Sequence, residues 1–497
     1  MKPCNLVGRQ PEVIGFLLRN ETLKPLTRPA RTKDSKKAQL RRGATALRQQ
    51  FAQHPGSVFS HVLGVAEITA VVAAHVHNYR ERIYSPLDTL RLFIGQVLSS
   101  DRACQDVVGR RLSERTAQGK STCTLNTGSY CDARARLPVG IPVALGNKIG
   151  ARLESMAPKA WRWQTRHVKL FDGTTVSMPD TPSNQQAFPQ SREQKPGLGF
   201  PVARIGALIG LASGAVLGYQ VAACEGKGTG EQSLLRDLLD HVAPGDVVLA
   251  DALLATWWII EGVLARGGDV VMAQHGRRIT DFTRGESLGG FDHVVDWPRP
   301  PRPKSMSAEQ YARYPEQLRM REVEVDGRIL VTTLLDPQAV SAVSLDSLYS
   351  MRWNIEVDFR TIKATLQMDV LRCKTQAMVE KEIAVYLLAY NLVRWTMAAA
   401  AMLMDVLPRT LSFTGANRLL AAFADQLRHA PGKRVTLMAG IVLSNIATLK
   451  LLNRPDRIEP RAKKRRPKPL PLLTVPRAVA REEIQRKRAL AGLKLAT

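Results

Sequence analysis

The sequence predicts a mixed α/β core set within a largely helical chain and interrupted by a β-rich insertion. Strand and helix patterns alternate over residues 167–273, whereas the first 160 residues show only helical spacing. Strand patterns return between residues 275 and 340, and helical spacing resumes after them. We therefore expect an α/β core with a β-strand insertion, an all-helical N-terminal region and a helical C-terminal region.

The core begins with three consecutive strand patterns. Apolar and β-branched residues dominate HVKLFDGTTVSM (167–178), VARIGALIGL (202–211) and AVLGYQVAA (215–223), and residues 212–214 suit a tight hairpin. This order predicts a mixed sheet that starts with an antiparallel meander. The elements that follow are a helix at about 231–241, a strand at 246–251, a tryptophan-rich helix and a strand at 269–273.

The net charge of +27 predicts a polyanionic partner. Nucleic acid is the favoured partner, and an anionic membrane surface is the alternative. The most apolar stretch, 387–407, is interrupted by Asn391, Arg394 and Asp405, whereas a membrane span needs about 20 apolar residues. We expect a buried helix there, no membrane partner and, because the N-terminus lacks an apolar signal segment, a cytoplasmic protein.

The six cysteines show no zinc-binding spacing. None forms a CxxC pair, and none has a histidine at the distance typical of a zinc site. We expect reduced, mostly buried thiols.

Two aspartates occupy strand positions suited to ligand binding. Asp172 lies near the middle of the first strand, and Asp251 lies at the carboxyl end of the fourth. Ligands of α/β sheets usually bind at such strand ends. The alternative is that each aspartate makes local hydrogen bonds at a turn.

A third carboxylate, Glu356, lies in LYSMRWNIEVDFRTIKATLQ (348–367). At about 100° per residue, one continuous helix places a polar stripe opposite an apolar face. Three cations around one carboxylate suit a phosphate backbone with a metal ligand inside it, although a solvated face with i,i+4 salt bridges is the alternative. The stripe holds Tyr349, Arg352, Glu356, Arg360 and Lys363, and the apolar face holds Met351, Ile355, Phe359, Ile362 and Leu366.

The spacing of Tyr349, Arg352, Glu356 and Lys363 resembles the Y-R-E-K box of bacterial insertion-sequence transposases that carry an Asp-Asp-Glu triad. Other blocks resemble this family in the same order along the chain. They are LFIGQVLSSDRACQDVV and NTGSYCDARARLP near the N-terminus, LFDGTTVSMPDTP (170–182), GLGFPVARI (197–205) and VVLADALLATWWIIEGVLARGGDVVM (247–272).

The resemblance implies a ribonuclease-H-like core in which Asp172, Asp251 and Glu356 bind two Mg²⁺ ions, with Mn²⁺ as a substitute. It also implies a homodimer that cleaves double-stranded DNA at terminal inverted repeats and joins the ends to target DNA, in the cytoplasm on the nucleoid. Carboxylate oxygens suit these hard cations. The implied DNA-binding residues are Tyr349, Arg352, Arg360, Lys363 and, as a stacking platform for a flipped base, Trp297.

Two departures and two other classes of protein bear on this interpretation. Ala273-Gln274 replaces a stretch where relatives often have a basic residue, and Trp297 could equally pack against prolines.

His275, Arg278 and Tyr311 or Tyr314 form part of the signature of tyrosine recombinases, enzymes that act through a covalent phosphotyrosine. A DNA-binding protein without catalysis is a further alternative. GKGTG (226–230) lacks the spacing of a phosphate-binding loop and predicts a mobile loop before a helix.

These patterns divide the chain into seven segments. Both ends are basic, and eight Lys or Arg residues between Arg454 and Lys468 predict an extended tail on the DNA backbone. The segments are a basic N-terminal segment (1–55), a helical DNA-binding or accessory domain (56–160), the first part of the catalytic core (161–274), the β-rich insertion (275–340), the core helix with the Y-R-E-K box (341–375), a helical C-terminal region (376–453) and the basic tail (454–497).

Overall fold

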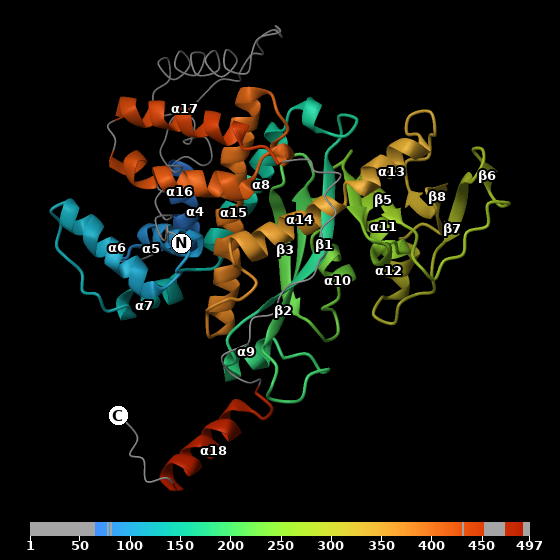
Figure 1. Ribbon diagram of the computed structural model, residues 1–497. Coiled ribbons are helices and arrows are strands. Elements are labelled where there is room, and N and C mark those ends of the chain that lie inside the picture. The colour runs from blue at the N-terminus through green and yellow to red at the C-terminus, as the bar shows by residue number, and fades with distance from the viewer. Residues whose placement is uncertain (1–64, 77–78, 80–81, 430–431, 452–472, 491–497) are drawn as a thin grey trace, which may run out of the picture.

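The computed structural model describes residues 65–76, 79, 82–429, 432–451 and 473–490. The predicted N-terminal segment 1–55 and the basic stretch 454–468 lie outside the described residues. In Figure 1, helices group on one side of the central strands β1–β3, and a strand-rich lobe lies on the other side.

Helices make up the first described region. Ser85 caps the second of them by accepting a hydrogen bond from the backbone N–H of Asp88 at 3.2 Å, and Pro86 occupies the first helical position. Between residues 65 and 161 the described elements are α4 (Val65–His75), α5 (Pro86–Leu98), α6 (Cys104–Ala117), α7 (Gly128–Arg136), α8 (Gly140–Met156) and the 3₁₀ turn η1 (Lys159–Trp161).

A nine-stranded sheet follows, in the order β3-β2-β1-β4-β5-β9-β8-β7-β6. β1 runs antiparallel to β2 and parallel to β4, so the predicted meander and mixed sheet are confirmed. The strands within residues 275–340 extend the same sheet, because β9 pairs with β5. The strands are β1 (Val168–Ser177), β2 (Val202–Gly210), β3 (Val216–Ala223), β4 (Val247–Ala250), β5 (Asp269–Ala273), β6 (Glu286–Ser287), β7 (Asp292–Pro298), β8 (Gln317–Val325) and β9 (Arg328–Thr332).

Side chains of the central strands alternate between two hydrophobic cores. Leu170 and Leu249 face the core that contains α8 (Gly140–Met156) and the later helices. Phe171 and Val248 face the core beneath the crossover helices α10 (Glu231–Arg236) and α11 (Trp257–Leu264). Alternation therefore decides on which face of the sheet each polar residue of β1 lies.

The β8–β9 hairpin has the turn that the sequence predicts. Asp326 and Gly327 are its two loop residues, with φ of 51° and 72°. Two positive φ values match the twist of the flanking strands, and glycine adopts such a conformation without strain.

Helices dominate the rest of the described chain. The long α15 (Gln376–Met404) has the length and composition of a membrane span, but 78% of its most apolar window is buried inside the protein, as in a core helix. The elements are the short α9 (Pro182–Ala187) and α12 (Ala308–Ala312), then α13 (Ala342–Ser350), α14 (Trp353–Arg360), the π-helical turn η4 (Thr361–Thr365), α15 (Gln376–Met404), α16 (Phe413–His429), α17 (Gly432–Thr448) and α18 (Arg477–Leu490).

The expectation of mostly buried thiols is wrong. Among the five cysteines in the described ranges, only Cys373 is buried, and Cys131 is exposed. The helices α6 and α7 cover Cys104 and Cys131 only partly, because both residues lie at the edge of the helical region, with their Sγ atoms 3.8 Å apart.

Candidate active site

The sheet brings the two predicted aspartates together. The parallel pairing of β1 with β4 aligns Leu170 with Leu249, so the same register two residues further on places Asp172 beside Asp251. Both residues follow the alternation of Leu170 and Leu249 and therefore face the same side of the sheet. The backbone N–H of Gly173 donates to Asp172 Oδ1 at 2.7 Å, and that of Leu253 donates to Asp251 Oδ1 at 3.0 Å.

Helix α14 packs on β1 and supplies the third carboxylate. Arg352 immediately precedes this helix, and its side chain lies between Asp172 and Glu356. Its Nη1 is 3.5 Å from Asp172 Oδ2, and its Nη2 is 3.2 Å from Glu356 Oε1. A single guanidinium thus links the strand carboxylate to the helix carboxylate.

The continuous helix predicted over residues 348–367 is wrong. The chain forms α13, breaks at Met351 and Arg352, continues as α14 and ends in a π-helical turn. Met351, placed on the apolar face by a regular wheel, is 39% exposed because it lies in the break. The other four apolar positions are buried as predicted: Ile355, Phe359, Ile362 and Leu366.

Tyr349 lies on α13, separated from the rest of the predicted stripe by the break. Its side chain is buried, and the Arg328 guanidinium lies 5.5 Å from the centre of its ring. Burial raises the pKa of Tyr349, the charge of Arg352 lowers it and that of Asp251 raises it. The phenol therefore lies near Asp251 and Arg352, at the edge of the core.

A cleft of about 350 Å³ opens beside Asp172 and Glu356. Lys363 Nζ donates to Thr174 Oγ1 at 3.4 Å across this cleft, and Arg360 is exposed at its rim. The π-helical turn that carries Lys363 is a conformation frequent at functional sites. The lining residues are Asp172, Gly173, Thr174, Glu356, Phe359, Arg360, Lys363 and Ala364.

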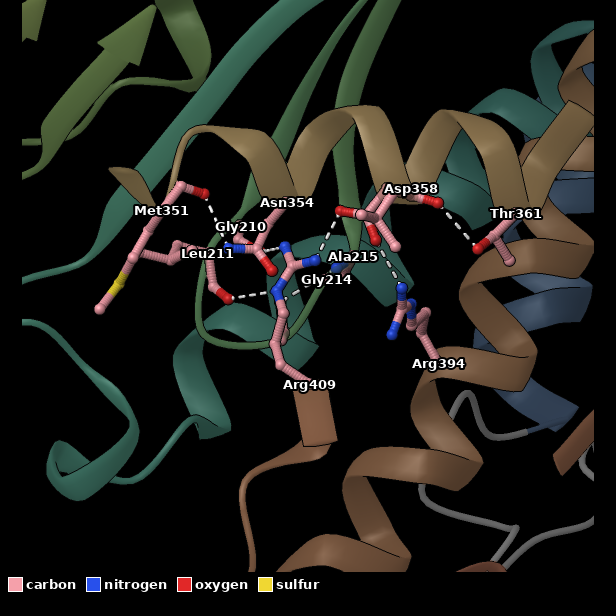
Figure 2. Close-up of polar contacts among 12 residues, drawn as sticks. Gly210, Leu211, Gly214, Ala215, Met351, Asn354, Asp358, Thr361, Arg394 and Arg409 are labelled. Atoms are coloured by element: carbon pink, nitrogen blue, oxygen red, sulfur yellow. Dashed lines mark hydrogen bonds and ion pairs between the residues drawn. The ribbon is translucent and has the colours of Figure 1, made fainter. Parts of the chain in front are cut away.

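A buried ionic cluster fixes α14 from the side opposite the cleft. Asp358, fully buried, has Oδ1 2.5 Å from Arg394 Nη2 and Oδ2 2.7 Å from Arg409 Nη1. The Tyr390 hydroxyl also donates to Asp358 Oδ1 at 3.1 Å. Figure 2 shows the two arginines converging on Asp358 from below the helix. We did not identify this cluster from the sequence, although a central aspartate on an otherwise apolar face was a usable signal.

The same cluster ties the helix to the sheet. Arg409 also donates to the carbonyl oxygens of Leu211 at 2.7 Å and Gly210 at 3.1 Å, in the turn between β2 and β3 (Figure 2). The position of Glu356 relative to β1 thus depends on the buried Arg394 and the partly buried Arg409 as well as on apolar packing.

A fourth carboxylate, Glu231, lies near the two aspartates, and we did not single it out from the sequence. The pKa of Asp172 is raised to about 6, chiefly by burial and also by the charges of Glu231 and Asp251, against the opposing effects of the Gly173 N–H and Arg352. Crowded carboxylates stabilise the neutral acid until a cation approaches.

The donor set suits a hard divalent cation. It offers carboxylate oxygens, which such ions prefer, and the Arg352 guanidinium partly offsets the negative charge of Asp172 and Glu356. Within the described residues no three acidic, histidine or cysteine side chains converge closely enough to enclose an ion. The carboxylates thus have the chemistry that a divalent metal requires, but their side chains must move closer together to surround the ion.

Trp297 does not offer a free ring to DNA. The side chain is 1% exposed, its Nε1 donates to Glu322 Oε1 at 2.7 Å, and the Arg278 guanidinium lies 3.4 Å from the ring centre. The expected role as a stacking platform is at odds with this burial, and the packing alternative agrees with it.

The residues of the tyrosine-recombinase pattern do not form a site. Arg278 lies on Trp297, and the Tyr311 hydroxyl donates to the carbonyl of Pro300 at 2.9 Å. Tyr314 packs edge-on against Trp258. Neither tyrosine hydroxyl therefore points toward His275 and Arg278, as a tyrosine recombinase site would require.

Known proteins similar to this chain are transposases. Residues 163–392, which contain all three predicted carboxylates, match the family described as the transposase DDE domain. The chain is 27% identical over 340 residues to the transposase InsG for insertion sequence element IS4 of Escherichia coli strain K12, covering 65% of this chain and 75% of that protein. Among solved structures, a piggyBac transposase synaptic complex with hairpin DNA matches with a TM-score of 0.38 and 11% identity, over 79% of this chain and 84% of that one. Residues 163–392 therefore form a transposase DDE domain, and this match together with the InsG relative supports a DNA transposase of the bacterial insertion-sequence type, an enzyme of metal-dependent DNA cleavage and strand transfer.

Proposed function

We propose that Asp172, Asp251 and Glu356 are the catalytic carboxylates with which this transposase cuts at the terminal inverted repeats of its element and joins the ends to target DNA. The observation that supports this assignment is their convergence on one face of the sheet from two strands and one helix. Asp172 and Glu356, which are more than a hundred positions apart in the chain, line one cleft.

The three carboxylates would hold divalent ions, which we propose to be Mg²⁺, with Mn²⁺ as a substitute. When bound, such ions activate the attacking water or 3′-hydroxyl and stabilise the leaving oxygen. Asp172 must be ionised to bind a cation, and Arg352 stabilises its charged form. Because Arg352 links Asp172 to Glu356, it also keeps the two carboxylates near each other.

The cations around the cleft would bind the DNA backbone. Arg360 is exposed at the rim, and Lys363 reaches across to Thr174, so both can contact phosphates that flank the scissile bond. Arg352 and the hydroxyl of Tyr349 lie deeper, near the carboxylates, where they would orient the reacting phosphate.

The full reaction would take place in a homodimer that bridges two element ends, on the nucleoid in the cytoplasm. The seven-segment division of the chain belongs to this proposal, with the basic ends as further contacts to DNA. Of the predicted tail, α18 is described, and Figure 1 shows it extending away from the sheet. A basic helix in this position can reach DNA beyond the cleft.

Cleavage of linear DNA carrying the element's ends tests the assignment. Asp172→Asn, Asp251→Asn and Glu356→Gln should each lower the cleavage rate by at least about a thousandfold, or about 4 kcal/mol of activation free energy, while end binding persists. Asp296→Asn on β7, outside the cleft, is the control and should cut like the wild type.

Wild-type cleavage rates in all three variants would contradict the assignment. A wild-type chain that binds ends but never cuts, with Mg²⁺ or with Mn²⁺, would instead favour a DNA-binding protein without catalysis. Protein covalently attached to DNA would favour the tyrosine recombinase alternative.

A further inference from the structure

Glu231 approaches the two aspartates from the opposite face of the sheet. It is the first residue of α10, which packs in the core that contains Phe171 and Val248. Its carboxylate fills the space that a side chain at Gly173 would occupy, directly beside Asp172 in β1. The absence of a side chain at position 173 therefore allows a carboxylate to reach the strand that carries Asp172.

Neighbouring contacts hold the start of α10 at this place. Gln232 Nε2 donates to the carbonyl of Leu253 at 2.9 Å, which joins α10 to the turn that follows Asp251. Arg204 Nη1 donates to the carbonyl of Thr229 at 3.0 Å and fixes the end of the glycine-rich loop. The start of α10 is thus held by β2, through Arg204, and by the turn after β4, through Leu253.

The carboxylate of Glu231 is poorly compensated. Within the described residues it accepts no hydrogen bond and forms no ion pair, although the charge of Arg204 lies near enough to favour its ionised form. Burial raises the pKa of Glu231, and the charge of Asp251 raises it further. A half-buried carboxylate beside two others is unfavourable without a cation, since like charges oppose ionisation.

We propose that Glu231 is a fourth carboxylate of the divalent-metal site and binds the metal together with Asp172 and Asp251. This inference rests on the proposed function of those two aspartates. Glu231 would contribute a carboxylate ligand from the face of the sheet opposite Glu356. The metal ion, held where β1 and β4 carry the two aspartates, would then have carboxylates on both sides of the sheet.

A different role for Glu231 would be purely structural. Acidic residues in the first turn of a helix interact favourably with the helix dipole, whether or not metal is present. In that case, removing the charge would lower stability in metal-free protein and leave metal affinity unchanged. Metal binding makes the reverse prediction, because loss of a repelling charge does not destabilise the metal-free site.

Calorimetric titration of the full chain with Mn²⁺ alone separates the two roles. Glu231→Gln keeps the shape of the side chain and should weaken Mn²⁺ binding by at least about tenfold. Glu261→Gln is the matched control, because Glu261 is another partly buried glutamate whose pKa is raised by burial, on α11. It should bind Mn²⁺ with wild-type affinity.

A second variant tests the placement without touching the carboxylate. Gly173 has a backbone conformation open to other residues, and the nearest atoms to an added Cβ all belong to Glu231. Gly173→Ala should therefore displace Glu231 and also weaken Mn²⁺ binding. Circular dichroism and thermal melting without metal would verify that both variants fold.

Wild-type Mn²⁺ affinity in folded Glu231→Gln would overturn the inference. If Asp172→Asn then loses Mn²⁺ binding, the proposed function stands and only the role of Glu231 fails. If neither variant alters Mn²⁺ binding, or if the wild-type chain shows no saturable binding, the metal site itself is wrongly assigned.

Discussion

Glu356 and Asp358 lie two residues apart on the same short helix, yet their surroundings are opposite. The side chain of Glu356 is 33% exposed at the cleft and contacts one cation, Arg352. Asp358 is fully buried and contacts two arginines and a tyrosine hydroxyl. Glu356 therefore has oxygen lone pairs available to bind a metal ion, whereas Asp358 is fully paired within the chain.

The contrast shows how one helix can serve both stability and catalysis. A buried carboxylate is stable only when paired, and breaking such a pair leaves an uncompensated charge. A carboxylate that binds a metal must instead remain accessible. The paired Asp358 can therefore hold α14 rigidly while Glu356 stays available.

The largest expected difference is in stability. Asp358→Ala should lower the free energy of unfolding by about 3–5 kcal/mol, because Arg394 and Arg409 lose their buried partner. Glu356→Ala should change it by at most about 1 kcal/mol, as for other exposed ion pairs. Urea unfolding followed by circular dichroism measures both, and equal losses in the two variants would remove the contrast.

A smaller effect is expected from Arg409. Arg409→Ala should cost about 1.5–3 kcal/mol, because Asp358 keeps Arg394 but loses a charged hydrogen bond. It should also lower cleavage, since Arg409 ties α14 to the turn between β2 and β3. Arg409→Lys keeps the positive charge but lacks the planar guanidinium, so it should recover only part of the stability and part of the cleavage rate. Unchanged stability in Arg409→Ala would show that the link to the turn is dispensable.

The pH dependence should show the same need for an available carboxylate at Asp172, which lies beside Glu356 at the cleft. Burial raises the pKa of Asp172 to about 6 from an ordinary value of 3.8, so its contribution to metal-free stability is present below pH 3.8 and lost as pH rises through about 6. Metal binding needs the ionised form, so Mn²⁺ affinity should rise over the same window, by about tenfold per pH unit below pH 6. Calorimetry between pH 5 and 7.5 tests this, with a flat profile as the contrary result.

The smallest effect concerns the rim of the cleft. If Arg360 and Lys363 each bind one phosphate, replacing either with Ala should reduce the salt dependence of DNA binding by about one unit of slope. Arg266→Ala, on the opposite face of the sheet and paired with Asp240, is the control. Filter binding over a range of salt concentrations measures the slope, and parallel lines for all variants would place the phosphates elsewhere.

Local patterns were sufficient for much of the fold. Alternating apolar residues predicted β1 to β5 within a residue or two, and Asp326-Gly327 predicted a hairpin. They failed where the periodicity continued through a break, because Met351 and Arg352 fit a helix wheel as well as their neighbours do. They also could not decide between a stacking and a packing role for Trp297, because its contacts with Glu322 and Arg278 join residues that are distant in the chain.

The sequence alone determined which side chains can do the chemistry: two strand aspartates, a glutamate among cations and a strongly basic chain. Only the tertiary structure decided which of them meet. The parallel register of β1 and β4 places Asp172 beside Asp251, and the Asp358 cluster fixes the helix that carries Glu356. It also brought Glu231 to Gly173 from the other face of the sheet. Such contacts join residues distant in the chain, so they depend on sheet register and buried charge pairing, which no local spacing encodes.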